Sequence, residues 1–155
     1  MGQETETLLQ EMEEENGGKI LFRTYCHLLG FSDGTSLDLG GLMYVVNEKL
    51  IFEDFEKQPG LLDLFGRKKK KAYEKFKIYR LVDDIKSVRF VRTSYAKRIV
   101  DGKADADKLP DVSRIEKLVA QTVLELSFKE TPYWYIELLN NKEFIKFVED
   151  THECI

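Results

Sequence analysis

The stretch GLMYVVNEKLIF, residues 41–52, contains two apolar runs around a polar centre. The runs Leu42–Val46 and Leu50–Phe55 are rich in β-branched, aromatic and leucine residues, and β-branched and aromatic residues favour strands. Between them, Asn47-Glu48-Lys49 is short enough for a tight turn, and asparagine tolerates the positive φ that such turns require. The stretch therefore predicts an antiparallel β-hairpin.

Further runs of strand length lie on both sides of this hairpin. One precedes it and four follow it, namely Lys19–Phe31, Phe76–Val82, Ile85–Val91, Thr122–Lys129 and Tyr133–Leu139. Turn-forming residues separate neighbouring runs, among them Ser32-Asp33-Gly34 and Asp83-Asp84. Together with the hairpin, these runs predict seven consecutive strands.

The fourth predicted strand, FKIYRLV at residues 76–82, alternates apolar and basic side chains. Because successive side chains of a strand point to opposite faces, we expect Phe76 and Ile78 to face inward. Lys77 and Arg80 are then expected to face outward, with Leu81 or Val82 completing the inner set.

Helices are predicted at both ends of the chain. Residues 1–16 form a short helix that carries Leu8, Leu9 and Met12 and stops at Asn16-Gly17-Gly18. Near the other end, Asn140 followed by Glu143 can cap a helix. Its apolar stripe consists of Phe144, Phe147, Val148 and Thr151, with Ile145 beside it.

Residues 93–121 separate the fifth and sixth predicted strands and are longer than a simple turn. Ser113-x-x-Glu116 is a capping box, and it is placed among the apolar residues Ile115, Leu118 and Val119. This segment is therefore interpreted as a helical insertion before strand six.

These elements predict a mainly β (α+β) protein in which seven antiparallel strands form a barrel or sandwich capped by a C-terminal helix. At 155 residues the chain is long enough for one domain with a real core. We assign residues 1–18 to an acidic N-terminal segment and residues 19–155 to that single domain.

Three stretches resemble the GRAM-type pleckstrin-homology-like (PH-like) domains. Residues 41–52 are similar to that family's strand–turn–strand pattern G-x-L-Y-x-T-N-x-R-L-I-F, and Tyr79–Val88 is similar to its pattern I-P-L-x-D-I-x-S-V. Glu137–Glu149 resembles its closing strand and helix. The resemblance covers about residues 19–152, and it implies a fold whose members bind phosphoinositides, peptides or no known ligand, so the fold does not choose among them. It also implies that Lys57–Lys75 joins strands three and four on the family's ligand rim.

The family's basic phosphoinositide motif in the first hairpin is not carried over. That hairpin holds Ser32, Asp33 and Asp38 and no base.

The chain has a net charge of −4, and its charges are strongly segregated along the sequence. Residues 1–18 carry six acids and no base, whereas residues 67–98 carry thirteen lysines and arginines against three acids. Such a basic stripe can orient a protein toward an anionic partner.

The candidate binding site is a loop in which an apolar tip meets five consecutive cations. It comprises Leu61, Leu62, Leu64, Phe65, Arg67, Lys68, Lys69, Lys70 and Lys71. Apolar side chains can enter the acyl boundary of a membrane, and each cation near an anionic surface contributes roughly 1 kcal/mol. An anionic membrane lipid or other acidic ligand is the expected partner, at a cytoplasmic or peripheral membrane location. The competing interpretation is a solvated charge run whose leucines fold back onto the barrel.

Two other kinds of partner remain open. Nucleic acid needs aromatic side chains exposed on the face that carries the cations, and only Tyr79 shares the parity of Lys77. The sequence thus disfavours nucleic acid. A protein partner could use Trp134, which Tyr133 and Tyr135 flank, although core packing is the favoured role for Trp134. The oligomeric state does not follow from the sequence.

No catalytic residue, metal ligand set or cofactor motif is predicted, and we expect no enzymatic activity. Cys26 and His27 are adjacent in a predicted strand, so their side chains point to opposite faces and cannot form a thiol–imidazole pair. His152 and Cys154 lie in the last four residues of the chain, without the spacing of a zinc site. No apolar run approaches the roughly 18 residues of a membrane-spanning helix.

Overall fold

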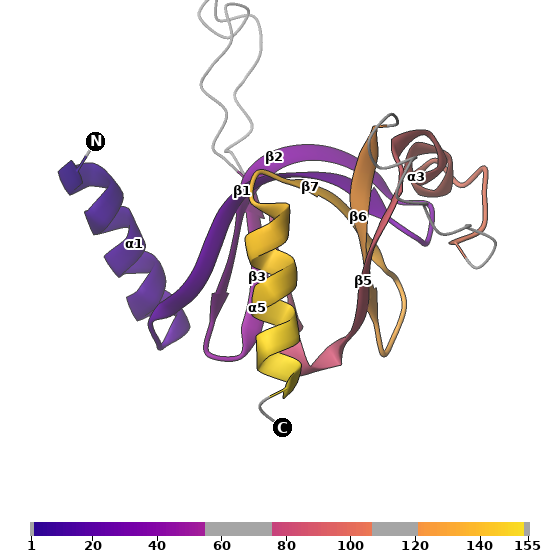
Figure 1. Ribbon diagram of the computed structural model, residues 1–155. Coiled ribbons are helices and arrows are strands. Elements are labelled where there is room, and N and C mark those ends of the chain that lie inside the picture. The colour runs from indigo at the N-terminus through magenta and orange to yellow at the C-terminus, as the bar shows by residue number, and fades with distance from the viewer. Residues whose placement is uncertain (1, 55–75, 107–120, 154–155) are drawn as a thin grey trace, which may run out of the picture.

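The computed structural model describes residues 2–54, 76–106 and 121–153. Over these residues the chain is mainly β, with seven strands in one antiparallel sheet of order β4-β3-β2-β1-β7-β6-β5. The strands are β1 (Ile20–Phe31), β2 (Ser36–Val46), β3 (Lys49–Asp54), β4 (Lys77–Leu81), β5 (Ile85–Arg92), β6 (Thr122–Phe128) and β7 (Trp134–Leu138). The sheet curls into a half-barrel (Figure 1), which confirms the predicted strand number and pairing sense.

The hairpin predicted from residues 41–52 is present. Val46 pairs with Lys49, so the turn consists of Asn47 and Glu48 alone. Their φ angles are 51° and 65°, the positive values of the two-residue turn whose twist matches that of the flanking strands.

Gly41 lies in the middle of β2, where the chain passes very close to β3. A Cβ atom at this position would lie 2.2 Å from the carbonyl oxygen of Glu53 and 2.9 Å from the Cα of Asp54. Both neighbouring atoms belong to backbone and cannot turn aside. The glycine is therefore required by the close approach of the strands.

The main core fills the concave inner face of the sheet, and the C-terminal helix covers it. All seven strands or the turns after them contribute, and the largest buried side chains include Trp134, Phe52 and Phe128. Helix α5 (Asn141–Glu153) crosses this face in Figure 1 and buries Phe144 completely. The predicted stripe is confirmed at Phe144 and Val148, while Phe147 is only partly buried.

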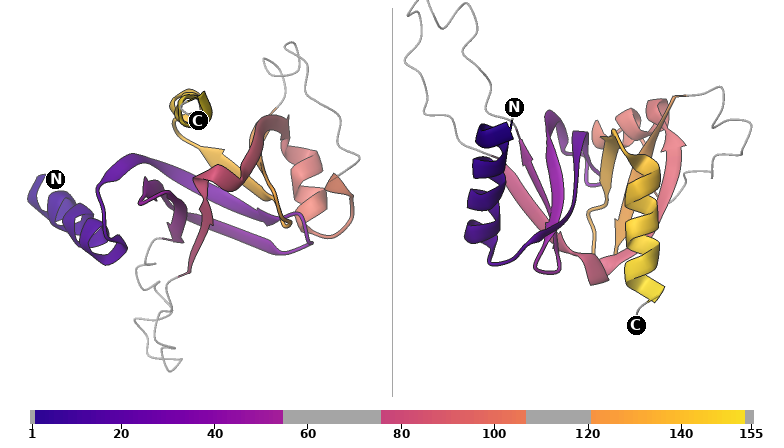
Figure 2. Two further views of the ribbon diagram at one scale, coloured as in Figure 1. Left: turned by 90° about the horizontal axis from the view of Figure 1, so that it is seen from below. Right: turned by 60° about the vertical axis from the view of Figure 1, so that its left-hand side comes forward.

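Two further helices pack on the outer face, because alternate residues of each strand point that way. Helix α1 (Gly2–Asn16) places Met12 against Tyr44, Val46 and Ile51 of β2 and β3. Helix α3 (Thr93–Val100) buries Ala96, Ile99 and Val100 over β1, β5, β6 and β7. Figure 2 shows these two helices at opposite ends of the curled sheet.

Helix α3 was not predicted, although its sequence carries a helical signal. Ala96, Ile99 and Val100 have i, i+3, i+4 spacing, and Asp101-Gly102 follows as a stop. The capping box Ser113-x-x-Glu116 and the helix expected around Ile115, Leu118 and Val119 lie outside the described residues.

The predicted orientation of Arg80 is wrong. Arg80 pairs with the inward-facing Leu50, and its guanidinium carbon lies 4.8 Å from the centre of the Phe128 ring. The same guanidinium donates hydrogen bonds to the carbonyl oxygens of Glu130 and Pro132. The long side chain thus packs its stem on the core and reaches polar partners across the gap between β4 and β5. A short 3-10 helix, η1 (Val82–Asp84), joins these two strands.

None of the described helices is long and apolar enough to cross a bilayer.

Candidate functional site

The candidate loop residues Leu61, Leu62, Leu64, Phe65 and Arg67–Lys71 lie outside the described residues. The structure does, however, fix both ends of the segment that contains them. The amide of Asp54 donates to the carbonyl oxygen of Phe76 at 3.0 Å, and the amide of Phe76 donates to Asp54 Oδ1 at 2.7 Å. The described residues on either side of 55–75 therefore lie next to one another, where β3 ends and β4 begins.

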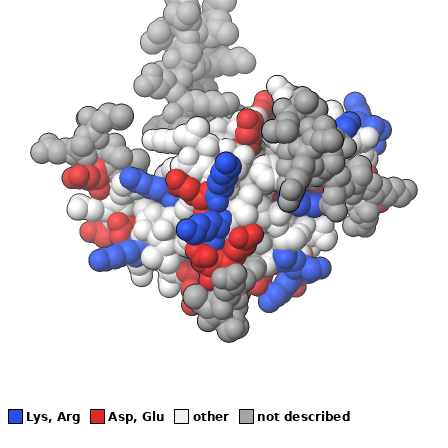
Figure 3. Space-filling model, in the orientation of Figure 1, with Lys and Arg blue, Asp and Glu red and all other residues white. Residues whose placement is uncertain are grey.

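Two cations of the predicted basic stripe form ion pairs with carboxylates of the fold. Lys77 Nζ lies 3.3 Å from Glu53 Oε1 and 3.6 Å from Glu15 Oε1. Arg89 Nε lies 2.6 Å from Glu125 Oε1. Figure 3 shows basic and acidic side chains interspersed over the face in view, without one continuous basic stripe. The stripe read from the sequence is thus broken up in the described part of the chain.

The outer face contains two similar clusters, each built from a buried glutamate, a buried tyrosine and a cation. Tyr135 Oη donates to Glu125 Oε2 at 2.7 Å, and Ser127 Oγ lies 3.3 Å from Glu125 Oε1. On the other half of the sheet, Tyr44 Oη donates to Glu53 Oε1 at 2.6 Å. Burial, and then the hydrogen-bonded carboxylate, raises the pKa of each tyrosine well above its usual value. Glu53 and Glu125 both have partners within the sheet, so these two clusters stabilise the fold.

The structure rules out Trp134 as an exposed interaction residue. Trp134 and Tyr135 are at most 2% exposed, because both faces of β7 are covered at this point. The core role favoured by the sequence is confirmed. The exposed large apolar side chains include Leu21, Tyr25 and Leu139.

Cys26 and His27 point to opposite faces of β1, as predicted. The Cys26 thiol is buried in the inner core, and burial raises its pKa to about 12. A thiol that remains protonated at neutral pH is a poor nucleophile. His27 faces the other way, where its Nε2 lies 2.5 Å from Asp38 Oδ1.

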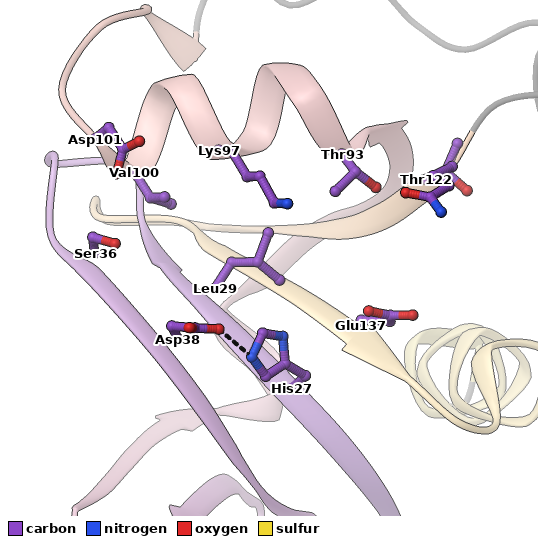
Figure 4. Close-up of a pocket in the computed structure, with 11 residues that line it drawn as sticks. His27, Leu29, Ser36, Asp38, Thr93, Lys97, Val100, Asp101, Thr122 and Glu137 are labelled. Atoms are coloured by element: carbon purple, nitrogen blue, oxygen red, sulfur yellow. Dashed lines mark ion pairs between the residues drawn. The ribbon is translucent and has the colours of Figure 1, made fainter.

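His27 also lines a pocket of about 630 Å³ beneath helix α3. The pocket is surrounded by the β1–β2 hairpin, β7, α3 and the start of β6 (Figure 4). The lining residues are His27, Leu29, Ser36, Asp38, Thr93, Lys97, Val100, Asp101, Gln121, Thr122 and Glu137. This volume lies within the range of about 300–1,000 Å³ typical of small-molecule sites.

The sequence does not predict this pocket, because its lining residues are far apart along the chain and none of them belongs to a recognisable motif. Asp38 reaches His27 through a register shift in the β1–β2 pairing and its own positive φ of 55°. Neither feature has a clear sequence signal.

In the part of the chain that the structure describes, no group of three or more His, Cys, Asp or Glu side chains is arranged to hold a metal ion.

Neither the protein-family models nor the curated proteins contain a match to this chain.

Proposed function

We propose that this chain is a non-catalytic PH-like binding module of the GRAM type, with a helical insertion between β5 and β6. In this proposal, the Leu61–Lys71 loop contacts an anionic membrane surface or another acidic ligand. The family assignment in this proposal rests on the sequence resemblance, and the structure contributes the coarser feature of a mainly β fold with seven antiparallel strands and a helix on the inner face. The module would act at the cytoplasmic face of a membrane, as a peripheral protein.

The observation that carries the proposal is the anchoring of residues 55–75 at a single point of the sheet. Asp54 and Phe76 hold the two ends together through two hydrogen bonds. Five consecutive cations and four apolar residues are therefore tethered to one rim of a packed scaffold. A short, concentrated segment of this composition combines the two attractions that a peripheral membrane contact needs.

The charge distribution of the described surface supports the same assignment. Lys77 and Arg89 are engaged by carboxylates of the sheet, and Arg80 lies over the Phe128 ring. These side chains are less able to attract an outside anion, because their charge is already compensated or held in place. The uninterrupted run Arg67–Lys71 is then the strongest source of positive charge in the sequence.

Vesicle co-sedimentation tests this proposal. We expect binding to phosphatidylserine-containing or phosphoinositide-containing vesicles and little binding to neutral vesicles. Raising the salt from 0.1 M to 1 M shortens the Debye length from about 10 Å to about 3 Å, so binding should weaken. The apolar tip should keep part of the binding at high salt. Changing Lys68–Lys71 to glutamine should remove the salt-dependent part.

The matched control is a second variant, Leu64→Ser with Phe65→Ser, which keeps all the cations. It should lose the salt-resistant part of binding while keeping its melting temperature. If both variants sediment as the unmodified protein does, the loop is not the contact. A loss of stability in the serine variant would instead show that Leu64 and Phe65 belong to the core.

A protein partner is the second candidate, and the exposed side chains Leu21, Tyr25 and Leu139 favour it. They are 67%, 58% and 73% exposed. Tyr25 and Leu139 adjoin one another, since the Leu139 amide donates to the Tyr25 carbonyl oxygen. Absence of vesicle binding in the unmodified protein would make this the better interpretation.

A further inference from the structure

The pocket under α3 combines an apolar base with a polar, mainly acidic wall. Leu29 of β1 and Val100 of α3 are almost completely buried and form the base. Asp38, Asp101 and Glu137 bring three carboxylates to the wall, against the single ammonium group of Lys97. Thr93 and Lys97 are four residues apart, so they lie on the same face of α3.

The charged groups of this wall differ in how they are engaged. Asp38 is paired with His27, whose other side faces Glu137 because His27 and Glu137 are register partners in neighbouring strands. The carboxylates of Asp101 and Glu137 and the ammonium of Lys97 form no ion pair with another described residue. Figure 4 shows these side chains around the hollow, on different elements. The pocket therefore has charge to offer to a ligand.

We propose that this pocket binds an organic cation carried on an extended apolar stem, such as the side chain of lysine. The stem would lie on Leu29 and Val100, and the cationic head would meet Glu137 and the neighbouring carboxylates. The two carboxylates without an ion pair, Asp101 and Glu137, outnumber the one lysine and favour a positive ligand, and the apolar base favours one with methylene groups. This site lies on the outer face of the sheet and is independent of the loop proposed above.

An NMR titration with capped amino acids tests the proposal directly. The probe is N-acetyl-lysine methylamide, and the matched ligand is N-acetyl-norleucine methylamide, which has a similar stem without the charge. We expect the lysine probe to shift the amide signals of His27, Lys97 and Glu137. It should bind about tenfold more tightly than the norleucine ligand, since one charge-assisted hydrogen bond supplies a tenfold gain in affinity.

A comparison with 1,5-diaminopentane tests the source of the cation. Tighter binding of the diamine indicates a free amine, and tighter binding of the capped lysine indicates a protein side chain.

Two variants give opposite expected effects, which separates a cation site from an anion site. Glu137→Gln removes an exposed carboxylate and should weaken the lysine probe about tenfold. Lys97→Gln removes the competing ammonium and should tighten the same probe several-fold. Glu130→Gln makes the same chemical change at an exposed turn outside the pocket lining and should have no effect.

Stronger binding of N-acetyl-glutamate methylamide than of the lysine probe would overturn the proposal. So would equal affinity of the lysine probe for the unmodified chain and for Glu137→Gln. Shifts confined to residues outside the pocket would place the site elsewhere and would also overturn it.

Discussion

Replacing Phe144 with alanine is expected to lower the free energy of unfolding by about 3–5 kcal/mol, the usual cost of deleting a fully buried aromatic ring. The Phe144 side chain has no exposed surface and belongs to the core on the inner face of the sheet. Its ring centre lies 5.7 Å from that of Phe22 in β1, so the deletion opens a cavity between helix and sheet. Urea denaturation measures the change.

Phe147→Ala is the matched control, because it deletes the same ring from the next turn of α5. Phe147 is partly buried and stacks on Phe22 at 5.6 Å. We expect this substitution to cost roughly half as much as Phe144→Ala, since part of the ring is already in contact with water. A larger loss for Phe147 than for Phe144 would mean that α5 packs on the sheet through a different face.

Replacing Arg89 with methionine should cost about 3 kcal/mol, near the lower end of the range for breaking a buried ion pair. The change leaves the Glu125 carboxylate, whose side chain is 2% exposed, without its cation. The hydrogen bonds from Tyr135 and Ser127 remain but do not supply a compensating charge. Denaturant melts of the variant and the unmodified protein give the difference.

Lys86→Met is the control for this prediction, as it removes one cation from the same strand at an exposed position. We expect a change within about 0.5 kcal/mol. The double variant Arg89→Met with Glu125→Gln should regain more than half of the loss, because the neutral amide needs no cation. If Arg89→Met alone costs less than about 1 kcal/mol, Glu125 does not depend on this pair.

Local patterns in the sequence predict much of this fold. The turn at Asn47-Glu48 follows from its position between two apolar runs, and the burial of Phe144 and Val148 follows from helical spacing. Both signals are contained within one or two adjacent elements. For that reason these features can be predicted without knowledge of the tertiary structure.

Features that depend on contacts between distant segments could not be predicted in this way. Arg80 has the same parity as Phe76 and Ile78, but its basic head group predicts an outward side chain. The inward position depends on Phe128 and the carbonyl groups near Pro132, which lie across the open side of the half-barrel. The His27–Asp38 contact depends on a register shift between β1 and β2. The candidate pocket depends in addition on where α3 packs.

The central claim is that the Leu61–Lys71 loop meets an anionic surface, and an amide NMR titration with bicelles tests it most directly. Neutral bicelles and bicelles containing phosphatidylserine are added to the same isotope-labelled chain. The claim predicts that anionic bicelles selectively shift or broaden the signals of residues 61–71, while those of β1 and β7 stay unchanged. Selective changes at Leu21, Tyr25 and Leu139, or no change with anionic bicelles, would contradict it.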